Sequence, residues 1–138
     1  MCLKIYLVDT NIFLEIMLSQ TRSGDCKTLL NMIKNGDIKA IVTDFSIYSI
    51  MLIMSNYLKI KELKVFLSSL SAYKGLTIYR SKLTDILMAV EIMEKKGLDV
   101  DDAMQYSAAF SSGAKAIISF DKHFDNLEIP GVEPARLI

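Results

Sequence analysis

Short apolar runs alternate along this chain with longer segments in which apolar positions recur every three or four residues. The short runs are typical of buried strands, and the longer spacing is typical of helices that cover a sheet. The pattern predicts strands at residues 3–8, 39–42, 76–79 and 115–120, and a last edge strand at 136–138. It predicts helices at residues 11–18, 23–34, 45–58, 60–73, 81–96 and 99–112, with a turn or short helix at 121–125. This alternation, without repeats or a low-complexity linker, indicates one α/β domain over residues 1–138 with a parallel sheet wrapped by helices.

Several predicted helix boundaries carry residues that often begin or end helices. Ser23 and Ser81 are placed to cap the helices that follow them, because a serine oxygen accepts a hydrogen bond from the first turn. Gly36, Gly97 and Gly113 follow predicted helices, and glycine adopts the left-handed conformation that often ends a helix.

The helix predicted at 45–58 is apolar on nearly all sides, which is typical of a helix buried in a core or in a protein interface. It coincides with the longest uncharged run of the chain, fourteen residues, whereas a membrane span needs roughly 20 apolar residues. We therefore expect no membrane-spanning segment.

Composition narrows the class of protein further. Apolar residues make up 51% of the 138 residues and charged residues 23%, which excludes a disordered chain. Sixteen basic and sixteen acidic residues give a net charge of zero, so attraction to a nucleic acid must come from a local patch. Cys2 and Cys26 lie 24 positions apart with no zinc-type spacing, which favours a reducing compartment, the cytoplasm.

Aspartates follow the predicted strands at the points where those strands end. Asp9 follows the first strand, Asp44 the second and Asp121 the fourth, and Asp102 stands in the first turn of the helix before the fourth strand. In a parallel sheet the functional crevice lies beyond the carboxyl ends of the strands, so we expect these acids to gather there.

Convergent carboxylates are typical of a site for Mg²⁺ or Mn²⁺, which prefer oxygen ligands. Such an ion activates water and stabilises an oxygen leaving phosphorus, so a phosphodiesterase needs no nucleophilic side chain. The chain has one histidine, His123, and neither a glycine-rich phosphate loop nor a Gly-x-Ser-x-Gly segment. Metal-dependent hydrolysis is therefore the chemistry that the sequence favours.

Each acid also has a purely structural interpretation. Asp9 and Asp121 can cap the helices that follow them, and Asp99 with Asp102 forms a capping box. His123 is interpreted as a surface residue. Three acids at one sheet edge would nevertheless repel one another unless a cation lies among them.

Three segments combine these acids with characteristic neighbours. Residues 7–13 read Leu-Val-Asp-Thr-Asn-Ile-Phe, residues 101–109 Asp-Asp-Ala-Met-Gln-Tyr-Ser-Ala-Ala, and residues 116–125 Ala-Ile-Ile-Ser-Phe-Asp-Lys-His-Phe-Asp. In this order they resemble the PIN domain family, with its strand into Asp-Thr-Asn, its Asp-Ala helix and its closing Ser-x-Asp-x-x-Phe segment. Glu133-Pro134 matches a common tail, so the resemblance covers essentially the whole chain.

The resemblance implies a three-layer α/β/α sandwich with a central, mainly parallel sheet of four to five strands. It implies an Mg²⁺- or Mn²⁺-dependent endoribonuclease, with RNA as substrate and a homodimer as the assembly. Many members are the VapC toxin of a toxin–antitoxin pair, which adds a cognate antitoxin as a partner. Carried over by position, the metal-binding and catalytic acids are Asp9, Asp102 and Asp121, the residues that orient them are Asn11 and Ser119, and outer carboxylates are Asp99 and Asp125.

One position departs from the family pattern. The segment 43–49 aligns with a family segment that ends in glutamate, and here its last residue is Ser49. Serine offers an oxygen without a charge, so we expect weaker metal binding. Asp44 is a possible substitute, five residues earlier in the chain.

Two functions of different classes follow from these residues. The three aspartates favour a metal-dependent ribonuclease, whereas Ser49 and the zero net charge favour a degenerate PIN fold that binds RNA or protein without cutting. A phosphoryl-transfer domain of the receiver or haloacid-dehalogenase kind is disfavoured. Asn11 stands where a dehalogenase-type enzyme needs a second acid, and the early acidic pair of a receiver domain is absent from the sequence. The lysines at 95, 96, 115 and 122 are candidates for contacting RNA around the rim of the site.

Overall fold

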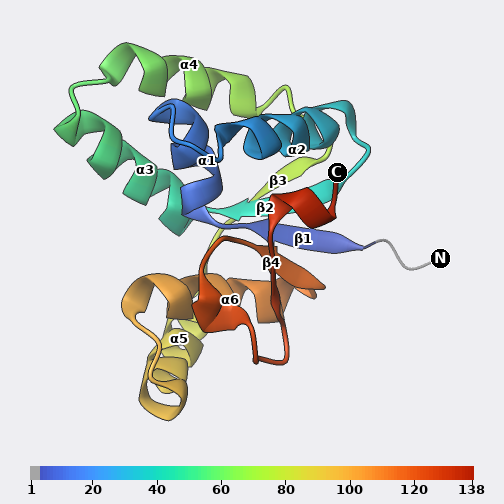
Figure 1. Ribbon diagram of the computed structural model, residues 1–138. Helices are drawn as coiled ribbons and strands as arrows, with labels where there is room; N and C mark the ends of the chain where they lie inside the picture. The colour runs from blue at the N-terminus through green and yellow to red at the C-terminus, as the bar shows by residue number, and fades with distance from the viewer. Residues whose placement is uncertain (1–3) are drawn as a thin grey trace.

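A five-stranded parallel sheet lies at the centre of the computed structural model, which describes residues 4–138 (Figure 1). Its strands are β1 (Ile5–Val8), β2 (Lys39–Thr43), β3 (Leu76–Tyr79), β4 (Ala116–Ile118) and β5 (Gly131–Val132). Their order across the sheet is β3-β2-β1-β4-β5, and every neighbouring pair is parallel. The predicted parallel sheet is confirmed, and Leu3, the predicted start of the first strand, lies outside the described residues.

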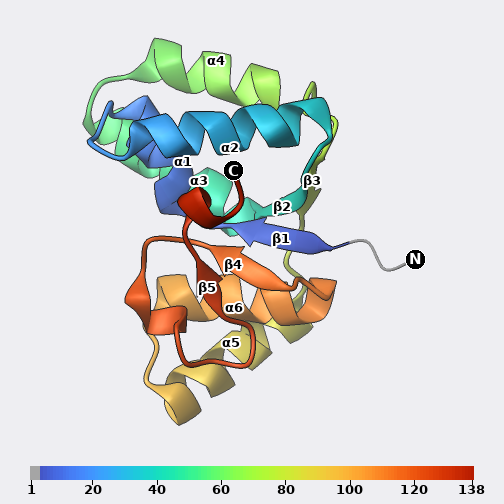
Figure 2. The same ribbon diagram turned by 45° about the vertical axis from the view of Figure 1, so that its right-hand side comes forward.

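Helices cover both faces of this sheet. Figures 1 and 2 show α1, α2, α3 and α4 on one face and α5 and α6 on the other, which confirms the three-layer α/β/α sandwich. The helices are α1 (Thr10–Met17), α2 (Ser23–Asn35), α3 (Asp44–Asn56), α4 (Ile60–Leu70), α5 (Leu83–Lys96) and α6 (Val100–Ser112). Two short 3₁₀ helices, Lys122–Phe124 and Pro134–Arg136, lie near the C-terminus.

The central strands are apolar at successive positions because both of their faces are buried. Val8 and Ile118 pack into the core under the first four helices, whereas Leu7 and Ile117 pack into the core under α5 and α6. Successive side chains of a strand point to opposite faces, so each central strand supplies both cores. This packing fixes the carboxyl ends of β1 and β4 side by side.

The last edge strand was predicted in the wrong place. The strand is β5 (Gly131–Val132), paired with β4, whereas residues 134–136 form a 3₁₀ helix and 136–138 no strand. Pro134 lacks a backbone N–H and its fixed φ suits the first position of a helical turn, which favours the helix there.

Two helix starts also differ from the prediction. Arg22, not Ser23, occupies the capping position of α2, and no side-chain cap forms there. Helix α5 begins at Leu83, and the Asp85 carboxylate accepts a 2.8 Å hydrogen bond from the Lys82 N–H in place of a Ser81 cap. The glycine ends are confirmed, since Gly36, Gly97 and Gly113 have φ of 86°, 69° and 73°.

Helix α3 is only partly buried. Ser46, Ile50 and Met54 face the core, whereas Tyr48 and Leu52 are 62% and 68% exposed. The all-round apolar character of this helix therefore reflects one core face and one exposed apolar face. No helix within residues 4–138 is long and apolar enough to cross a membrane.

Candidate metal centre

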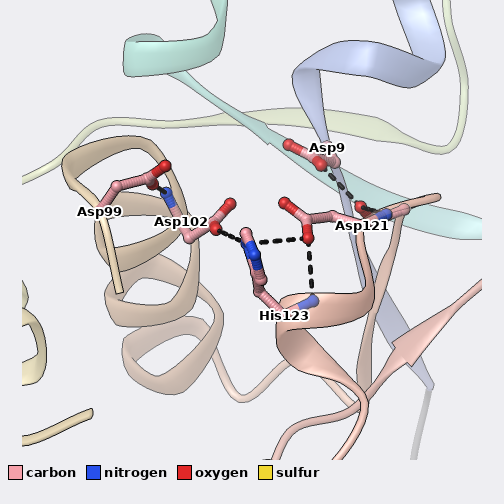
Figure 3. A network of polar contacts seen from close by, with 6 residues as sticks. Asp9, Asp99, Asp102, Asp121 and His123 are labelled. Carbon is pink, nitrogen blue, oxygen red and sulfur yellow. Dashed lines mark hydrogen bonds and ion pairs between the residues drawn. The ribbon is translucent and has the colours of Figure 1, made fainter. Parts of the chain in front are cut away.

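Acidic side chains converge at the carboxyl ends of β1 and β4, as Figure 3 shows. Asp9 follows β1 directly, Asp121 follows β4 after two residues, and Asp102 reaches toward them from the first turn of α6. They line a cleft of about 250 Å³, together with Thr10, Asn11, Ser49, Ile53, Asp99 and Asp101. We call this the acidic cleft.

The acids of this cleft are held in place by the starts of helices. Asp9 Oδ1 accepts a 2.8 Å hydrogen bond from the Thr10 N–H, and Asp121 Oδ1 accepts one of the same length from the His123 N–H. Asp99 Oδ1 accepts a 2.9 Å bond from the Asp102 N–H, which fixes the start of α6 and with it the backbone that carries the Asp102 carboxylate. Asp9, Asp99 and Asp121 therefore both cap helices and line the acidic cleft.

Ser119 links two of the acids. Its hydroxyl donates a 2.7 Å hydrogen bond to Asp9 Oδ2 and accepts a 2.9 Å bond from the Asp121 N–H. Ser119 is 3% exposed, so water cannot replace these partners. The link fixes the Asp9 carboxylate relative to the backbone of Asp121.

Burial and mutual repulsion make these carboxylates costly to ionise. Burial raises the pKa of Asp9, and the charge of Asp121 adds to this effect, while hydrogen bonds from Ser119 and Thr10 oppose it. Burial also raises the pKa of Asp102 to about 6, and the hydrogen bond to His123 offsets part of that increase. Acids with raised pKa values that face one another are typical of a cation site.

His123 lies against this cluster. Its Nδ1 is 2.7 Å from Asp102 Oδ2 and 3.0 Å from Asp121 Oδ1, and the three ligand atoms lie within 4.8 Å of one another. The hydrogen bond to Asp102, with the charges of Asp121 and Asp102, raises the pKa of His123. The side chain is 64% exposed, as expected of a surface residue, but it also contacts the acids, which the sequence did not predict.

Two residues that the sequence proposed lie outside the acidic cleft. Asp125 is exposed behind the Lys122–Phe124 turn, where its Oδ1 faces Gly131. Asp44 accepts hydrogen bonds from the N–H groups of Phe45 and Ser81, at 2.9 and 3.2 Å, and ties α3 to the segment before α5. Asp44 therefore does not take the place of the absent glutamate.

A buried polar network beneath Asp9 was not predicted from the sequence. The Gln105 Nε2 donates hydrogen bonds to the hydroxyls of Ser46 and Thr10 and lies 3.4 Å from Asp9 Oδ1. The Thr43 hydroxyl donates to Gln105 Oε1 at 3.0 Å and lies 3.1 Å from Ser46 Oγ. Gln105, Ser46 and Thr43 are each at most 1% exposed. The sequence feature that could have indicated this network is the glutamine three residues after Asp102, in a mainly apolar stretch of α6.

A larger cleft of about 670 Å³ lies between α1, α2 and α4. Its walls are mainly apolar, with Phe13, Phe66 and Tyr73 among them, and Glu62 is its one acid among the described residues. It contains none of the convergent acids, so we assign the chemistry to the acidic cleft.

Comparisons with known proteins agree with this architecture. Among curated proteins, none matches this chain. VapC20 from Mycobacterium tuberculosis, described as a sarcin-ricin loop cleaving toxin, superposes with a TM-score of 0.74 at 12% identity, over 90% of this chain and 95% of that one. A toxin–antitoxin complex from Klebsiella pneumoniae gives 0.70 at 17% identity, over 94% and 97%. VapBC2 from Rickettsia felis, bound to a DNA fragment from its promoter, gives 0.68 at 16%, over 94% and 98%.

These structures show a shared fold, since their identities to this chain are low. The match at the level of the family is independent of them and comes from the sequence. The model of the PIN domain matches residues 6–130, a range that contains Asp9, Asp102 and Asp121. The chain belongs to the PIN domain family.

Proposed function

We propose that the protein is a metal-dependent endoribonuclease that hydrolyses RNA phosphodiester bonds in the acidic cleft. The observation that carries this proposal is the convergence of Asp9, Asp102 and Asp121 from three separate segments on one cleft at the sheet edge. PIN domains are generally nucleases, and the family model covers residues 6–130, a range that contains the three aspartates.

The side chains present fit a divalent cation of the Mg²⁺ or Mn²⁺ kind. Carboxylate oxygens are the ligands these ions prefer, and Asp9, Asp102 and Asp121 would hold the ion, with His123 as a nitrogen donor at its side. Burial, with a smaller contribution from the charge of Asp121, raises the pKa values of Asp9 and Asp102, and a bound cation stabilises their ionised forms. When bound, it supplies charge neutralisation for the phosphate and a lower pKa for the attacking water.

The surrounding residues orient these carboxylates. Ser119 holds Asp9 Oδ2, and Gln105 lies beneath Oδ1, so the plane of the Asp9 carboxylate is fixed from both sides. Asn11 is exposed at the cleft, where its amide is available to the RNA or to water. Asp99 fixes the start of α6 and thereby the position of Asp102.

The test is cleavage of a mixed RNA pool by purified protein with Mn²⁺ or Mg²⁺. Asp9→Asn is the matched variant, because it keeps the shape of the side chain and removes the charge, and EDTA is the second control. Cleavage that both controls abolish supports the proposal. Cleavage that survives Asp9→Asn in a folded protein contradicts it.

A second function is favoured by Ser49, which lines the acidic cleft where the family has glutamate. With one charge fewer, the protein would act as a PIN module that binds RNA or protein without cutting. Binding of the RNA pool with a measurable Kd, combined with no cleavage in Mn²⁺ by folded protein, identifies this role.

We also propose that the protein is the toxin of a toxin–antitoxin pair in the cytoplasm, since the similar structures include toxin–antitoxin complexes. The buried free thiol of Cys26 fits a reducing compartment, and Cys2 lies outside the described residues. Growth arrest on expression, relieved by the neighbouring gene and lost in Asp9→Asn, tests this role. Growth unaffected by an active nuclease contradicts it.

A homodimer is the assembly that we propose. Helix α5 exposes Leu83, Ile86, Leu87 and Val90, one stripe at helical spacing, and the exposed face of α3 is also apolar. Apolar faces of this kind are typical of protein interfaces. Light scattering should give a dimeric mass that Leu87→Glu reduces to that of a monomer, and a monomeric wild-type protein contradicts the assembly.

A further inference from the structure

A second cleft adjoins the acidic cleft. It measures about 370 Å³ and is lined by Asn11, Glu15, Gln20, Arg22, Phe120 and Asp121. Asn11 and Asp121 line both clefts, so the two spaces meet at these residues. An RNA strand that reacts in the acidic cleft would therefore extend into this one, which we call the arginine cleft.

Arg22 is held in the arginine cleft from two directions. Its backbone N–H donates a 3.0 Å hydrogen bond to Glu15 Oε2, and Glu15 is 7% exposed on α1. The carbon of its guanidinium lies 3.6 Å from the centre of the Phe120 ring, a close cation–π contact. Phe120 stands between Ser119 and Asp121, so the guanidinium is anchored directly to the segment that carries the acids.

The guanidinium keeps its hydrogen-bonding groups free. Glu133 is its ion-pair partner, but the distance from Nη1 to Oε1 is 3.9 Å, which is too long for a hydrogen bond. Within residues 4–138 the guanidinium donates no hydrogen bond. Its five N–H groups form a planar fork that matches the oxygens of a phosphate. An arginine that is positioned but has no hydrogen-bond acceptor is suited to bind an anion.

Arg22 is the one basic residue that lines a pair of otherwise acidic or neutral clefts, within the part of the chain that the structure describes. Five aspartates line the acidic cleft, and RNA carries a negative charge on every phosphate. Among the described residues that line either cleft, Arg22 is the one with a positive charge. Lys115, one of the lysines expected to contact RNA, directly precedes β4 and lies beside Lys4. It is therefore at the amino ends of the strands, whereas the acids are at the carboxyl ends.

We propose that the arginine cleft binds an RNA phosphate next to the one that is cleaved, through Arg22 stacked on Phe120. The inference rests on the proposed ribonuclease function and names the residue that positions the substrate. Arg22 contributes binding rather than chemistry, so its loss raises KM and leaves kcat nearly unchanged. Glu133 competes weakly for the guanidinium, and Glu133→Gln should strengthen RNA binding.

The test compares Arg22→Gln and Arg22→Lys with Lys115→Gln, a control that removes one charge at the amino ends of the strands. Binding of short single-stranded RNA of mixed sequence is measured by fluorescence anisotropy in Mn²⁺, in an Asp9→Asn background that prevents cleavage. KM and kcat are measured in the cleaving protein. Circular dichroism and Mn²⁺ affinity, which Arg22 should not change, verify that each variant is folded with an intact acidic cleft.

We expect Arg22→Gln to weaken RNA binding on the order of tenfold, because a charge-assisted hydrogen bond is lost. The slope of log K against log salt should fall by about 0.7, the value for one contact to single-stranded nucleic acid. Arg22→Lys should keep that slope and recover part of the affinity, because lysine keeps the charge but not the fork or the stacking.

An unchanged affinity and salt slope in Arg22→Gln, or an equal loss in Lys115→Gln, overturns this inference while leaving the ribonuclease proposal standing. A folded wild-type protein that neither binds nor cleaves RNA overturns both. The two failures are therefore distinguishable.

Discussion

The Ser119 hydroxyl donates a 2.7 Å hydrogen bond to Asp9 Oδ2, across 110 positions of the sequence. The same hydroxyl accepts the Asp121 N–H, so one buried oxygen relates the acids at the ends of β1 and β4. A carboxylate that is oriented before a cation binds loses less conformational freedom on binding. Ser119 should therefore affect metal affinity without touching the metal.

Ser119→Ala tests this relationship. We expect Mn²⁺ affinity to fall roughly tenfold or more, since residues that orient metal ligands typically contribute 10–100-fold. Isothermal titration of Mn²⁺ into the metal-free protein measures the change. Ser55→Ala, at an exposed position of α3, is the control and should bind Mn²⁺ like the wild type. Equal affinities in all three proteins would show that Asp9 is oriented without Ser119.

Much of the fold and several of the acids could be predicted because they depend on local pattern. Strand-end acids such as Asp9 and Asp121 follow from where an apolar run stops, and parallel strands bring such ends to one edge. The strand predicted at 136–138 was wrong because β5 depends on pairing with β4 rather than on its own two residues. The pattern of apolar residues predicts which segments form helices and strands. It does not predict which short segment pairs with the edge strand of the sheet.

The polar contacts around the acids could not be predicted from the sequence for a related reason. Gln105 meets Thr43 and Ser46 only because β2, α3 and α6 converge, at separations of 62 and 59 positions. Arg22 and Phe120 likewise come from distant segments. Nothing local distinguishes these residues from ordinary helix and loop residues, so tertiary packing alone reveals them.

Gln105→Leu tests the buried network. Leucine has a similar size but removes the hydrogen bonds that Gln105 makes to Thr43 and Ser46, and a buried polar group that loses a partner costs about 1–3 kcal/mol. We expect the free energy of unfolding to fall by about 2–3 kcal/mol, measured by urea denaturation. Gln20→Leu, at an exposed position, is the matched control and should change it little. Similar losses in both variants would mean that the network adds nothing specific.

Asp85 should make stability depend on pH. Burial raises the pKa of this carboxyl, but hydrogen bonds from the Lys82 N–H, Ser111 and Tyr79 outweigh that effect, so its pKa lies below the usual value. A depressed pKa contributes stability that is present above the unfolded value, about 3.9, and is lost as pH falls through the folded value.

Asp85→Asn removes this contribution. The variant should unfold more easily than the wild type at pH 7. The difference should shrink below about pH 4, where Asp85 becomes protonated in the unfolded chain before it does so in the folded wild type. Urea midpoints measured across this pH range follow the difference. Asp37→Asn, at an exposed position after α2, is the control. A difference between Asp85→Asn and the wild type that stays constant with pH would assign the effect to shape rather than charge.

Ser49→Glu adds a carboxylate on α3, at the position where the resemblance to PIN domains leads us to expect glutamate. Ser49 lines the acidic cleft with Asp9, Asp102 and Asp121, so a fourth carboxylate there should raise Mn²⁺ affinity on the order of tenfold and increase the rate of RNA cleavage. Without metal, the added repulsion should lower the free energy of unfolding. Opposite changes in metal affinity and metal-free stability are difficult to explain by a general effect on folding.

Ser49→Gln separates charge from size, since it has the length of glutamate without its charge, and Ser55→Glu adds the same charge on an exposed part of α3. Neither should raise Mn²⁺ affinity. If Ser49→Glu leaves Mn²⁺ affinity and cleavage rate unchanged, the absent glutamate does not limit this site. The three aspartates would then be a sufficient set, with His123 beside Asp102 and Asp121 as a nitrogen donor.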